Sequence, residues 1–353
     1  MGKNGIAVVG RMAPDAQLLD GQTVKTNILC EELRRRFPDR EFVLVDTYQY
    51  SKHVFPILMS TCKAFFRCSH IFVLLSRNGR RFFFPLLTGL NRIFHRRMYH
   101  DVIGGALPGE AAKSKALCRQ LNRFEVNWVE FSQMKDQLRE LGITNAEVLP
   151  NFKRLQILKQ EELPQHTEEP FVFSMFSRVT REKGMTAAAQ AVSQVNKTLG
   201  RIAAVVNIYG PVEESYREEF EQVLKTYDDC VRYLGCIPQD QSVEALRSSF
   251  MLLFPSVYPG EGMPGTIIDA FSAGLPVIAT DWHFNGELVK SGLTGYCYDW
   301  QQPDLLAQHI LHAVTHPKKV DAMRCNCLSE AVKYMPDTVM EQIIQKMNEG
   351  ADA

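Results

Sequence analysis

Two carboxylates, Glu261 and Asp269, stand at the ends of the short segment EGMPGTIID in the second half of the chain. Apolar residues recur at helical spacing from Gly265 or Thr266 until Gly274, which predicts a loop followed by a helix. The first amides of a helix have no partner within it and the helix dipole is positive there, so this start predicts an anion site. An acid beside a bound anion is repelled by it, so we expect both acids to hold hydroxyl groups farther along the ligand.

Arg178 and Lys183 add positive charge to the same region of the predicted fold. The segment FVFSMFSRVTREKG places Arg178 just past a strand and Lys183 in the following loop. Ligands of open α/β sheets bind beyond the carboxyl ends of the strands, where a guanidinium fork and an ammonium can neutralise a diphosphate. Considered alone, the cations would be surface charges and Asp269 would only stabilise the helix dipole. Their combination favours a ligand that carries both a diphosphate and hydroxyl groups.

The elements that must position these residues alternate between strand and helix along both halves of the chain. This alternation predicts two α/β domains, each with a parallel sheet. The polar segment 158–170 carries prolines and is interpreted as the linker between them. The loop between the first strand and the first helix contains Gly21 but no GxGxxG, which disfavours an NAD-dependent oxidoreductase.

The composition is that of a globular protein from a reducing compartment. Apolar residues make up 45% of the 353 residues and charged residues 23%, so each domain can bury a core. The nine cysteines include no CxxC pair that would hold zinc, and scattered single cysteines argue against a disulfide framework. The N-terminal residues fit neither a signal peptide nor a myristoylation pattern. We therefore expect a cytoplasmic protein.

The formal charge is zero overall but is divided unevenly between the halves. Residues 1–165 carry 25 Lys/Arg and 16 Asp/Glu, whereas residues 166–353 carry 15 and 24. Residues 52–100 contain nine Lys/Arg and no acid, interleaved with runs such as FFF and FVLL that are far shorter than the ~18 to 20 apolar residues of a membrane span. Such a segment suits an anionic membrane surface or nucleic acid, and the alternative is a core with a solvated basic face. We expect contact with an anionic membrane and no nucleic-acid partner.

Three blocks of the second half, SRVTREKG, EGMPGTIIDAFSAGLPVIATD and NGELVKSGLTGYCYD, resemble the signature blocks of glycosyltransferase family 4, the retaining group 1 glycosyltransferases of GT-B fold. Upstream, DGQTVKTNI and AEVLPNF resemble that family's N-terminal loop and domain-closing strand. The resemblance implies two Rossmann-like domains whose parallel sheets face each other across a cleft. Residues 1–160 would bind the acceptor, residues 161–335 would bind the nucleotide sugar, and a C-terminal helix at 336–353 would pack back on the first domain.

The resemblance also implies roles for individual residues. Arg178 and Lys183 would bind the donor diphosphate and stabilise it as it leaves, and Glu261 would contact hydroxyls of the transferred sugar. Asp269 would hold the ribose of the nucleotide. Backbone groups would supply the other donor contacts, to the phosphates at Gly21, Gly265, Thr266 and Ile267 and to the base around Gly210 and Ile237.

Two features depart from the family pattern. The family usually has Glu at both ends of the opening segment, and here Asp269 is one methylene shorter, which should shift the ribose contact. The family also often carries a histidine at a strand end of the first domain. His100 is the catalytic candidate for that place, with Asp101 and Gly104 as alternatives. A missing base would not abolish retaining transfer, in which the leaving phosphate can accept the proton of the acceptor.

We therefore predict a retaining hexosyltransferase that uses a nucleotide-diphosphate sugar, with UDP favoured over GDP. No metal is expected, because the chain has no DxD pair. The acceptor would be a lipid-linked sugar or a polysaccharide precursor, at the inner face of the cell membrane, where residues 52–100 would hold the enzyme peripherally. The alternatives are another GT-B enzyme, such as a sugar phosphorylase or a nucleotide-sugar epimerase, and a non-catalytic nucleotide-sugar-binding protein.

Overall fold

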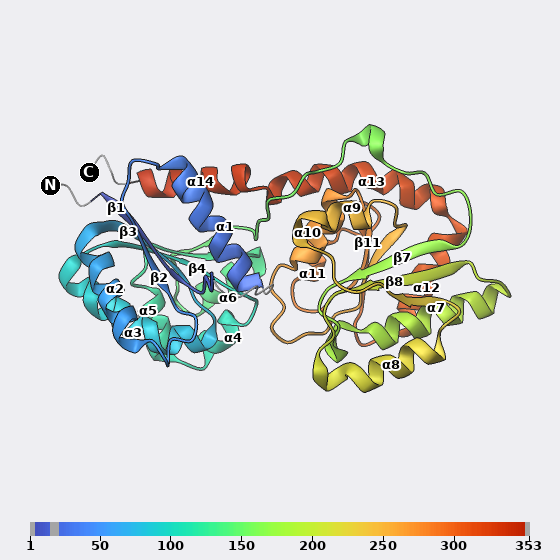
Figure 1. The fold of residues 1–353 in the computed structure, drawn as a ribbon, viewed down its shortest axis with the longest axis horizontal. Helices are drawn as coiled ribbons and strands as arrows, with labels where there is room; N and C mark the ends of the chain where they lie inside the picture. The colour runs from blue at the N-terminus through green and yellow to red at the C-terminus, as the bar shows by residue number, and fades with distance from the viewer. Residues whose placement is uncertain (1–3, 15–20, 350–353) are drawn as a thin grey trace. The chain divides into compact units, whose positions relative to one another are not determined.

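The computed structural model describes residues 4–14 and 21–349. The chain divides into two compact units, with Met1–Lys153 and Pro336–Ala353 in unit 1 and Arg154–Met335 in unit 2 (Figure 1). Unit 2 thus begins before residue 161, where the sequence places the second domain, and includes the segment 158–170.

Unit 1 is built on a parallel sheet of six strands in the order β2-β1-β3-β4-β5-β6. The strands are β1 (Gly5–Gly10), β2 (Phe42–Asp46), β3 (Cys68–Leu74), β4 (Arg97–Asp101), β5 (Val126–Val129) and β6 (Ala146–Val148). The helices are α1 (Gly21–Arg36), α2 (Val54–Arg67), α3 (Arg77–Phe94), α4 (Leu107–Ala112), α5 (Lys115–Leu121), α6 (Ser132–Glu140) and α14 (Pro336–Asn348).

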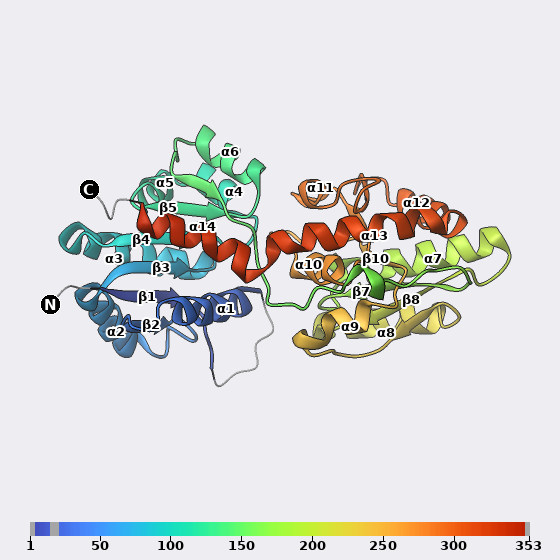
Figure 2. The ribbon, with the colours of Figure 1, turned by 90° about the horizontal axis from the view of Figure 1, so that it is seen from above.

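Helices cover both faces of this sheet. Figure 1 shows α1 and α14 on one face and α2 and α3 on the other, and Figure 2 shows α14 lying across the strands. β1 is buried along its whole length, as expected for a central strand covered on both sides. α14 comes from the far end of the sequence, yet Val339, Met340 and Ile343 are fully buried in one core with Leu29 of α1 and Phe72 of β3.

Unit 2 contains a second parallel sheet of six strands, in the order β12-β11-β10-β7-β8-β9. The strands are β7 (Phe171–Phe176), β8 (Ala204–Tyr209), β9 (Val231–Tyr233), β10 (Met251–Phe254), β11 (Val277–Thr280) and β12 (Gly295–Tyr298). The helices are α7 (Met185–Leu199), α8 (Arg217–Thr226), α9 (Ser242–Leu246), α10 (Gly265–Ser272), α11 (Asn285–Leu288), α12 (Asp304–Thr315) and α13 (Pro317–Ala331). Short 3₁₀ helices are η1 (Gln160–Glu162), η2 (Arg181–Lys183), η3 (Glu214–Tyr216), η4 (Gln239–Gln241) and η5 (Val332–Tyr334).

The end of α10 follows from its sequence. Gly274 adopts the left-handed conformation with φ 61°. The Leu275 amide then donates to the Ala270 carbonyl at 2.8 Å, a bond typical of a helix that ends at a left-handed glycine. Gly274 therefore ends α10 as the sequence predicts, and the chain turns directly into β11.

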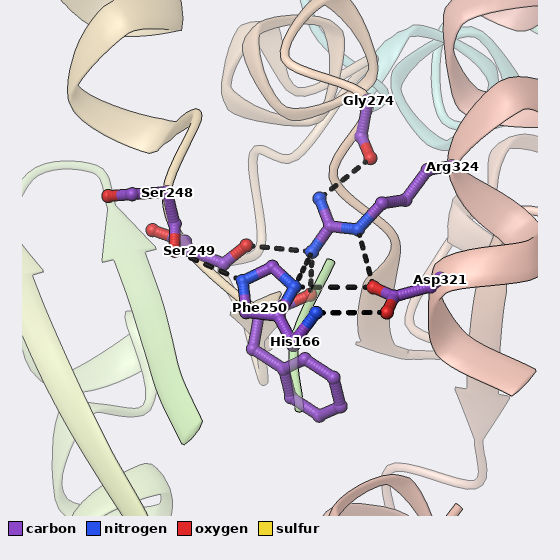
Figure 3. A network of polar contacts seen from close by, with 7 residues as sticks. All are labelled: His166, Ser248, Ser249, Phe250, Gly274, Asp321 and Arg324. Carbon is purple, nitrogen blue, oxygen red and sulfur yellow. Dashed lines mark hydrogen bonds and ion pairs between the residues drawn. The ribbon is translucent and has the colours of Figure 1, made fainter. Parts of the chain in front are cut away.

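A buried arginine fixes both α13 and the segment 158–170 within unit 2 (Figure 3). Arg324 is 1% exposed, and its guanidinium donates to the carboxylate of Asp321 and to the carbonyls of Ser249, Phe250 and Gly274. His166 joins this network through its backbone amide, which donates to Asp321 at 3.0 Å. The segment interpreted from sequence as a linker is therefore packed on unit 2, because its polar groups have partners there.

The basic segment 52–100 divides between core and surface. Phe72 in β3 and Phe83 and Phe84 in α3 are fully buried, whereas Phe82 is 42% exposed. FVLL and two of the three residues of FFF therefore lie in the core, as the alternative interpretation of this segment predicts. Among the described residues, no helix is long and apolar enough to span a bilayer.

Candidate active site

The candidate site lies at the carboxyl ends of two neighbouring strands of unit 2. β10 pairs in parallel with β7, so both strands end at the same edge of the sheet. The loop after β7 carries Arg178 and the turn η2, and the loop after β10 carries Glu261 and leads into α10. The Val257 amide donates to the Glu182 carbonyl at 2.8 Å, which ties the two loops together.

Two glycines let these loops approach other backbone closely. Gly184, between η2 and α7, has φ 79°, and a Cβ there would lie 2.6 Å from the carbonyl oxygen of Pro255. Gly210 follows β8 with φ 131°, and a Cβ there would lie 1.9 Å from the carbonyl oxygen of Ser177. Since real Cβ atoms do not come that close to backbone, any other residue would force the loops apart. The two glycines therefore set the backbone spacing of the site.

Lys183 and Glu261 form a buried ion pair at this edge. The Nζ of Lys183 lies 2.5 Å from the Oε2 of Glu261, and the side chains are 9% and 10% exposed. The Ser256 hydroxyl donates to the same carboxylate oxygen at 2.7 Å. An ammonium has three N–H donors, so the pair leaves Lys183 with donors for an anion. The sequence predicts contacts of the two residues with different parts of a ligand, and the structure adds that they contact each other.

Aromatic rings lie next to the cations of the site. The Nζ of Lys183 lies 5.2 Å from the ring centroid of Phe254 and 5.3 Å from that of Tyr258. Arg178 is exposed, and its guanidinium carbon lies 5.6 Å from the same Tyr258 ring. The negative face of an aromatic ring attracts a cation within ~6 Å. Tyr258 therefore helps to orient both cations.

The backbone of Tyr258 is itself fixed by two donors. Its carbonyl accepts the Glu261 amide at 3.1 Å and the indole N–H of Trp282 at 2.9 Å. Trp282 follows β11 and packs edge-on against Trp300, with 4.8 Å between ring centroids. Sequence reasoning missed Ser256, Tyr258 and Trp282 as residues that hold this site. Their position just after strands was the available signal, but they have no charge that would single them out.

The start of α10 contains three residues that are predicted to contact phosphate, Gly265, Thr266 and Ile267. α10 begins at Gly265, as predicted, and Gly265 and Thr266 are partly exposed there. The Ile267 amide donates to the Pro264 carbonyl at 3.0 Å, so it already has one partner within the turn. The helix dipole adds positive potential at this end of α10.

Asp269 lies in the interior of unit 2. Its side chain is 1% exposed and accepts a hydrogen bond from the Ser242 hydroxyl at 2.7 Å. Ser242 is the first residue of α9, so this bond joins α9 to α10. The predicted contact of Asp269 with a ribose stays a prediction.

The remaining donor contacts expected from the sequence are backbone positions. Gly210 and Ile237 follow the neighbouring strands β8 and β9, and the Gly210 amide donates to the Gly235 carbonyl at 2.8 Å. Gly21 is the first residue of α1 in unit 1, and a Cβ there would meet no atom of the described chain within 4 Å. Packing within unit 1 therefore does not require a glycine at 21. The roles of all three positions toward a nucleotide stay predictions.

His100 is a core residue of unit 1. Its side chain is fully buried at the end of β4, with Nδ1 2.9 Å from the Oδ1 of Asn127 and with its ring against Phe84 and Phe124. Burial lowers the pKa of His100 to about 3. An enclosed, neutral imidazole is poorly placed to exchange a proton with a substrate. The catalytic role of His100 stays a prediction, and we leave it out of the proposed chemistry.

Asp101, the neighbouring candidate, is engaged in a buried cluster. The Nζ of Lys25 lies 2.6 Å from Asp101 Oδ1 and 3.5 Å from Glu130 Oε1, and the three side chains are at most 5% exposed. Burial raises the pKa of Asp101, although the adjacent Lys25 acts in the opposite direction. Sequence reasoning missed Lys25 and Glu130, because single charges on a helix and after a strand are usually solvated.

The charges at the β7–β10 edge suit an anion with hydroxyl groups attached. Arg178, Lys183 and the start of α10 supply positive potential, and Glu261 supplies an acceptor. Within the described ranges, no group of three or more His, Cys, Asp or Glu side chains is arranged to hold a metal ion.

Comparisons with known proteins concern mainly this unit. Residues 170–316, which include Arg178, Lys183, Glu261 and α10, match the family described as glycosyl transferases group 1. The amylovoran biosynthesis glycosyltransferase AmsK of Erwinia amylovora is 25% identical over 144 residues, which cover 40% of this chain and 34% of AmsK. The O-antigen chain mannosyltransferase B of Escherichia coli is 26% identical over 119 residues, or 34% of this chain and 30% of that protein. These alignments span about a third of the relatives' own length.

The whole chain has the fold of known glycosyltransferase structures. The crystal structure of Anabaena HepE in complex with UDP superposes with a TM-score of 0.77, covering 98% of this chain and 100% of HepE at 15% sequence identity. This likeness confirms the predicted GT-B fold class, with its two parallel α/β sheets. Residues 170–316 are therefore similar to group 1 glycosyl transferases, and the chain has the GT-B fold.

Proposed function

We propose that this protein is a glycosyltransferase that moves a sugar from a nucleotide-diphosphate sugar to an acceptor. The match of residues 170–316 to group 1 glycosyl transferases supports sugar transfer as the activity. A protein of the same fold, HepE, has been solved in complex with UDP. This supports a nucleotide sugar as donor and favours a UDP-sugar over a GDP-sugar. The single observation that carries the proposal is the buried Lys183–Glu261 pair at the carboxyl ends of β7 and β10, beside Arg178 and the start of α10.

In this proposal the cations of the site bind the diphosphate of the donor. Arg178 offers a bidentate fork and Lys183 a point charge, while the amides of Gly265 and Thr266 and the dipole of α10 act on the phosphate oxygens. Negative charge grows on the diphosphate as the bond to the sugar breaks. Preorganised donors aimed at that charge lower the barrier, and they do so without a metal ion.

Glu261 would hold hydroxyl groups of the transferred hexose. Lys183 and Ser256 orient its carboxylate, so the acid keeps one position when the sugar arrives. Asp269 would contact the ribose, and Gly21, Gly210 and Ile237 would complete the donor site through their backbone. We further propose retention of the anomeric configuration, as in family 4, with the departing phosphate accepting the proton of the acceptor hydroxyl.

The acceptor would be a lipid-linked sugar or a polysaccharide precursor at the cytoplasmic face of the membrane, bound mostly by unit 1. Two curated relatives support this choice, because their names place them in amylovoran and O-antigen assembly. The basic segment 52–100 of unit 1 supports the membrane location.

A radiolabelled donor assay tests the proposal. The purified protein is incubated with UDP- and GDP-sugars, with and without a lipid extract as acceptor. We expect transfer of label to lipid, and only slow hydrolysis without acceptor. Conversion of the donor sugar into its epimer would identify an epimerase, and release of sugar phosphate from a polymer with inorganic phosphate would identify a phosphorylase. Donor binding without any turnover would identify a binding protein.

A further inference from the structure

The helix α2 of unit 1 is apolar on two opposite sides. Ile57, Ala64 and Phe65 face the core and are at most 6% exposed. Three large apolar side chains lie on the other side, Phe55, Met59 and Phe66, which are 74%, 60% and 59% exposed. Their spacing of four and seven residues places them in one stripe along the helix. A surface helix normally carries polar residues on its outer side, so this stripe needs a partner.

The neighbouring helix α3 extends the exposed apolar surface. Phe82 and Ile93 are 42% and 74% exposed, and their spacing of eleven residues puts them on one side of α3. The two helices touch, because the Phe66 ring packs edge-on against Phe94 with 4.9 Å between centroids. We call Phe55, Met59, Phe66, Phe82 and Ile93 the α2–α3 apolar face.

Lysine and arginine side chains that form no ion pair with an acidic residue of the described chain lie on or beside the helices of the α2–α3 apolar face. Lys52, Lys63, Arg81 and Arg92 are exposed on or beside α2 and α3, and no ion pair involves them in the part of the chain that the structure describes. Residues 52–100 hold nine Lys/Arg and no Asp or Glu. An apolar stripe flanked by lysine and arginine matches an anionic lipid bilayer, in which acyl chains lie beneath a layer of phosphates.

We infer that the α2–α3 apolar face docks unit 1 on an anionic membrane surface, with its aromatic and aliphatic side chains in the interface and its cations on the phosphates. A second copy of the chain fits less well, because a symmetric contact would set the same cations against each other. Single-stranded nucleic acid also fits less well, because bases stack on aromatic rings and not on Met59 or Ile93. The inference uses only the surface of unit 1, so it stands or falls independently of sugar transfer.

Vesicle flotation with the full chain tests this docking. The probes are vesicles of phosphatidylcholine alone and vesicles with about 30% phosphatidylglycerol, at about 0.05 M and about 0.5 M salt. We expect flotation with the anionic vesicles at low salt, little with neutral vesicles, and weaker binding at high salt because exposed charges are then screened. No flotation with anionic vesicles at low salt would overturn the inference.

Matched variants locate the surface. The triple change Phe55→Ser, Met59→Ser and Phe66→Ser should lower vesicle partitioning at least about tenfold, because apolar side chains no longer enter the interface. The control changes Ile202, Leu293 and Val332 to Ser, which are 43%, 54% and 51% exposed in unit 2, and should bind as wild type. Equal binding of both triple variants would contradict the inference. Unchanged thermal unfolding shows that the exposed substitutions leave the fold intact.

A second pair of variants tests the cations. Lys63→Gln, Arg81→Gln and Arg92→Gln together should weaken binding to anionic vesicles by about fivefold per charge. The control removes the same charge from exposed positions elsewhere in unit 1, with Lys113→Gln, Lys115→Gln and Arg123→Gln. If light scattering instead shows a dimer that the serine variant dissociates, and vesicles are not bound, the face is covered by a second copy and the inference is wrong.

Discussion

At the level of single residues, the candidate site depends on the pairing of Lys183 with Glu261. Both were predicted from their type and from their position after a strand. That they pair was not predictable, because they lie 78 residues apart and meet only since β7 and β10 are neighbours in the sheet. His100 shows the opposite case. Its place at a strand end was right, but only the packing of Phe84 and Phe124 reveals that it is enclosed.

Glu261→Gln should separate catalysis from nucleotide binding. The change keeps the shape of the side chain but leaves the buried Lys183 without its counter-charge, so the free energy of unfolding should fall by about 3 kcal/mol. We expect sugar transfer to fall at least about a hundredfold, because the sugar hydroxyls lose an ionic acceptor. Binding of UDP, measured by calorimetric titration, should change little.

The matched control is Glu182→Gln, an exposed acid in the turn η2 next to Lys183. The rate of sugar transfer and the free energy of unfolding of this variant should equal those of the wild type within experimental error. Sugar transfer by Glu261→Gln at the wild-type rate would mean that Glu261 only balances the charge of Lys183.

Asp269 can be tested against the residue that it bonds. Asp269→Ala and Ser242→Ala both remove the hydrogen bond between α9 and α10, so each should lower the free energy of unfolding by about 1 to 3 kcal/mol. If Asp269 also holds the ribose, only Asp269→Ala should weaken UDP binding, by about tenfold. Equal UDP affinities of the two variants in a titration would leave Asp269 with a structural role alone.

At the level of elements, sequence periodicity predicts most strands and helices of both sheets. The helix α10 and its end at Gly274 were predictable, because the apolar spacing and the glycine agree. The exposed apolar side chains on the outer sides of α2 and α3 were not predictable, because hydropathy alone cannot tell which of two apolar sides of a helix packs on the sheet. The packing of the polar segment 158–170 on unit 2 was not predictable, since its contacts with Asp321 join it to a distant element.

Buried histidines of unit 1 should make its stability depend on pH. Burial lowers the pKa of His100 to about 3 and that of His70 to about 4, from 6.5 in the unfolded chain. The unfolded state then binds more protons, so this contribution to stability is complete above pH 6.5. It falls by up to about 1.4 kcal/mol per pH unit for each histidine, down to about pH 4 for His70 and about pH 3 for His100.

The free energy of unfolding, measured with denaturant between pH 4 and 7, should change less steeply with pH in His100→Gln than in the wild type, because one titrating group is absent. His53→Gln, at an exposed position before α2, serves as the control and should keep the wild-type slope. An unchanged slope in His100→Gln would contradict the burial of a neutral imidazole.

A substitution at Gly210 should destabilise the fold mainly because a Cβ would overlap neighbouring backbone, and only partly because of the positive φ angle. Gly210→Ala would place a Cβ 1.9 Å from the Ser177 carbonyl oxygen, so we expect a loss of about 3 kcal/mol in the free energy of unfolding. Gly142→Ala is the control, because Gly142 also has a positive φ, 78°, but its Cβ would have open space in the described structure. It should cost about 1 kcal/mol in thermal unfolding experiments. Equal losses would show that backbone strain alone accounts for Gly210.

At the level of the whole molecule, the chain forms two α/β units, and unit 1 contains both the N-terminal and the C-terminal part of the sequence. The return of α14 to the core of unit 1 brings residues from opposite ends of the sequence together. The charge division follows the proposed tasks, with the basic half toward a membrane and the region similar to group 1 glycosyl transferases on the acidic half. The nucleotide base is hard to predict from the sequence, because backbone groups make most of the proposed base contacts.

Calorimetric titration with UDP tests the central claim, that the β7–β10 edge of unit 2 binds a nucleotide diphosphate. The wild type is compared with Arg178→Ala and with Arg181→Ala, two exposed arginines of the same loop. Arg181 pairs with Glu219 on the surface, 2.5 Å away, so it serves as the control. We predict that UDP binds the wild type and Arg181→Ala equally and binds Arg178→Ala at least about tenfold more weakly. Absence of UDP and GDP binding to the wild type, or equal affinity of the two variants, would contradict the account.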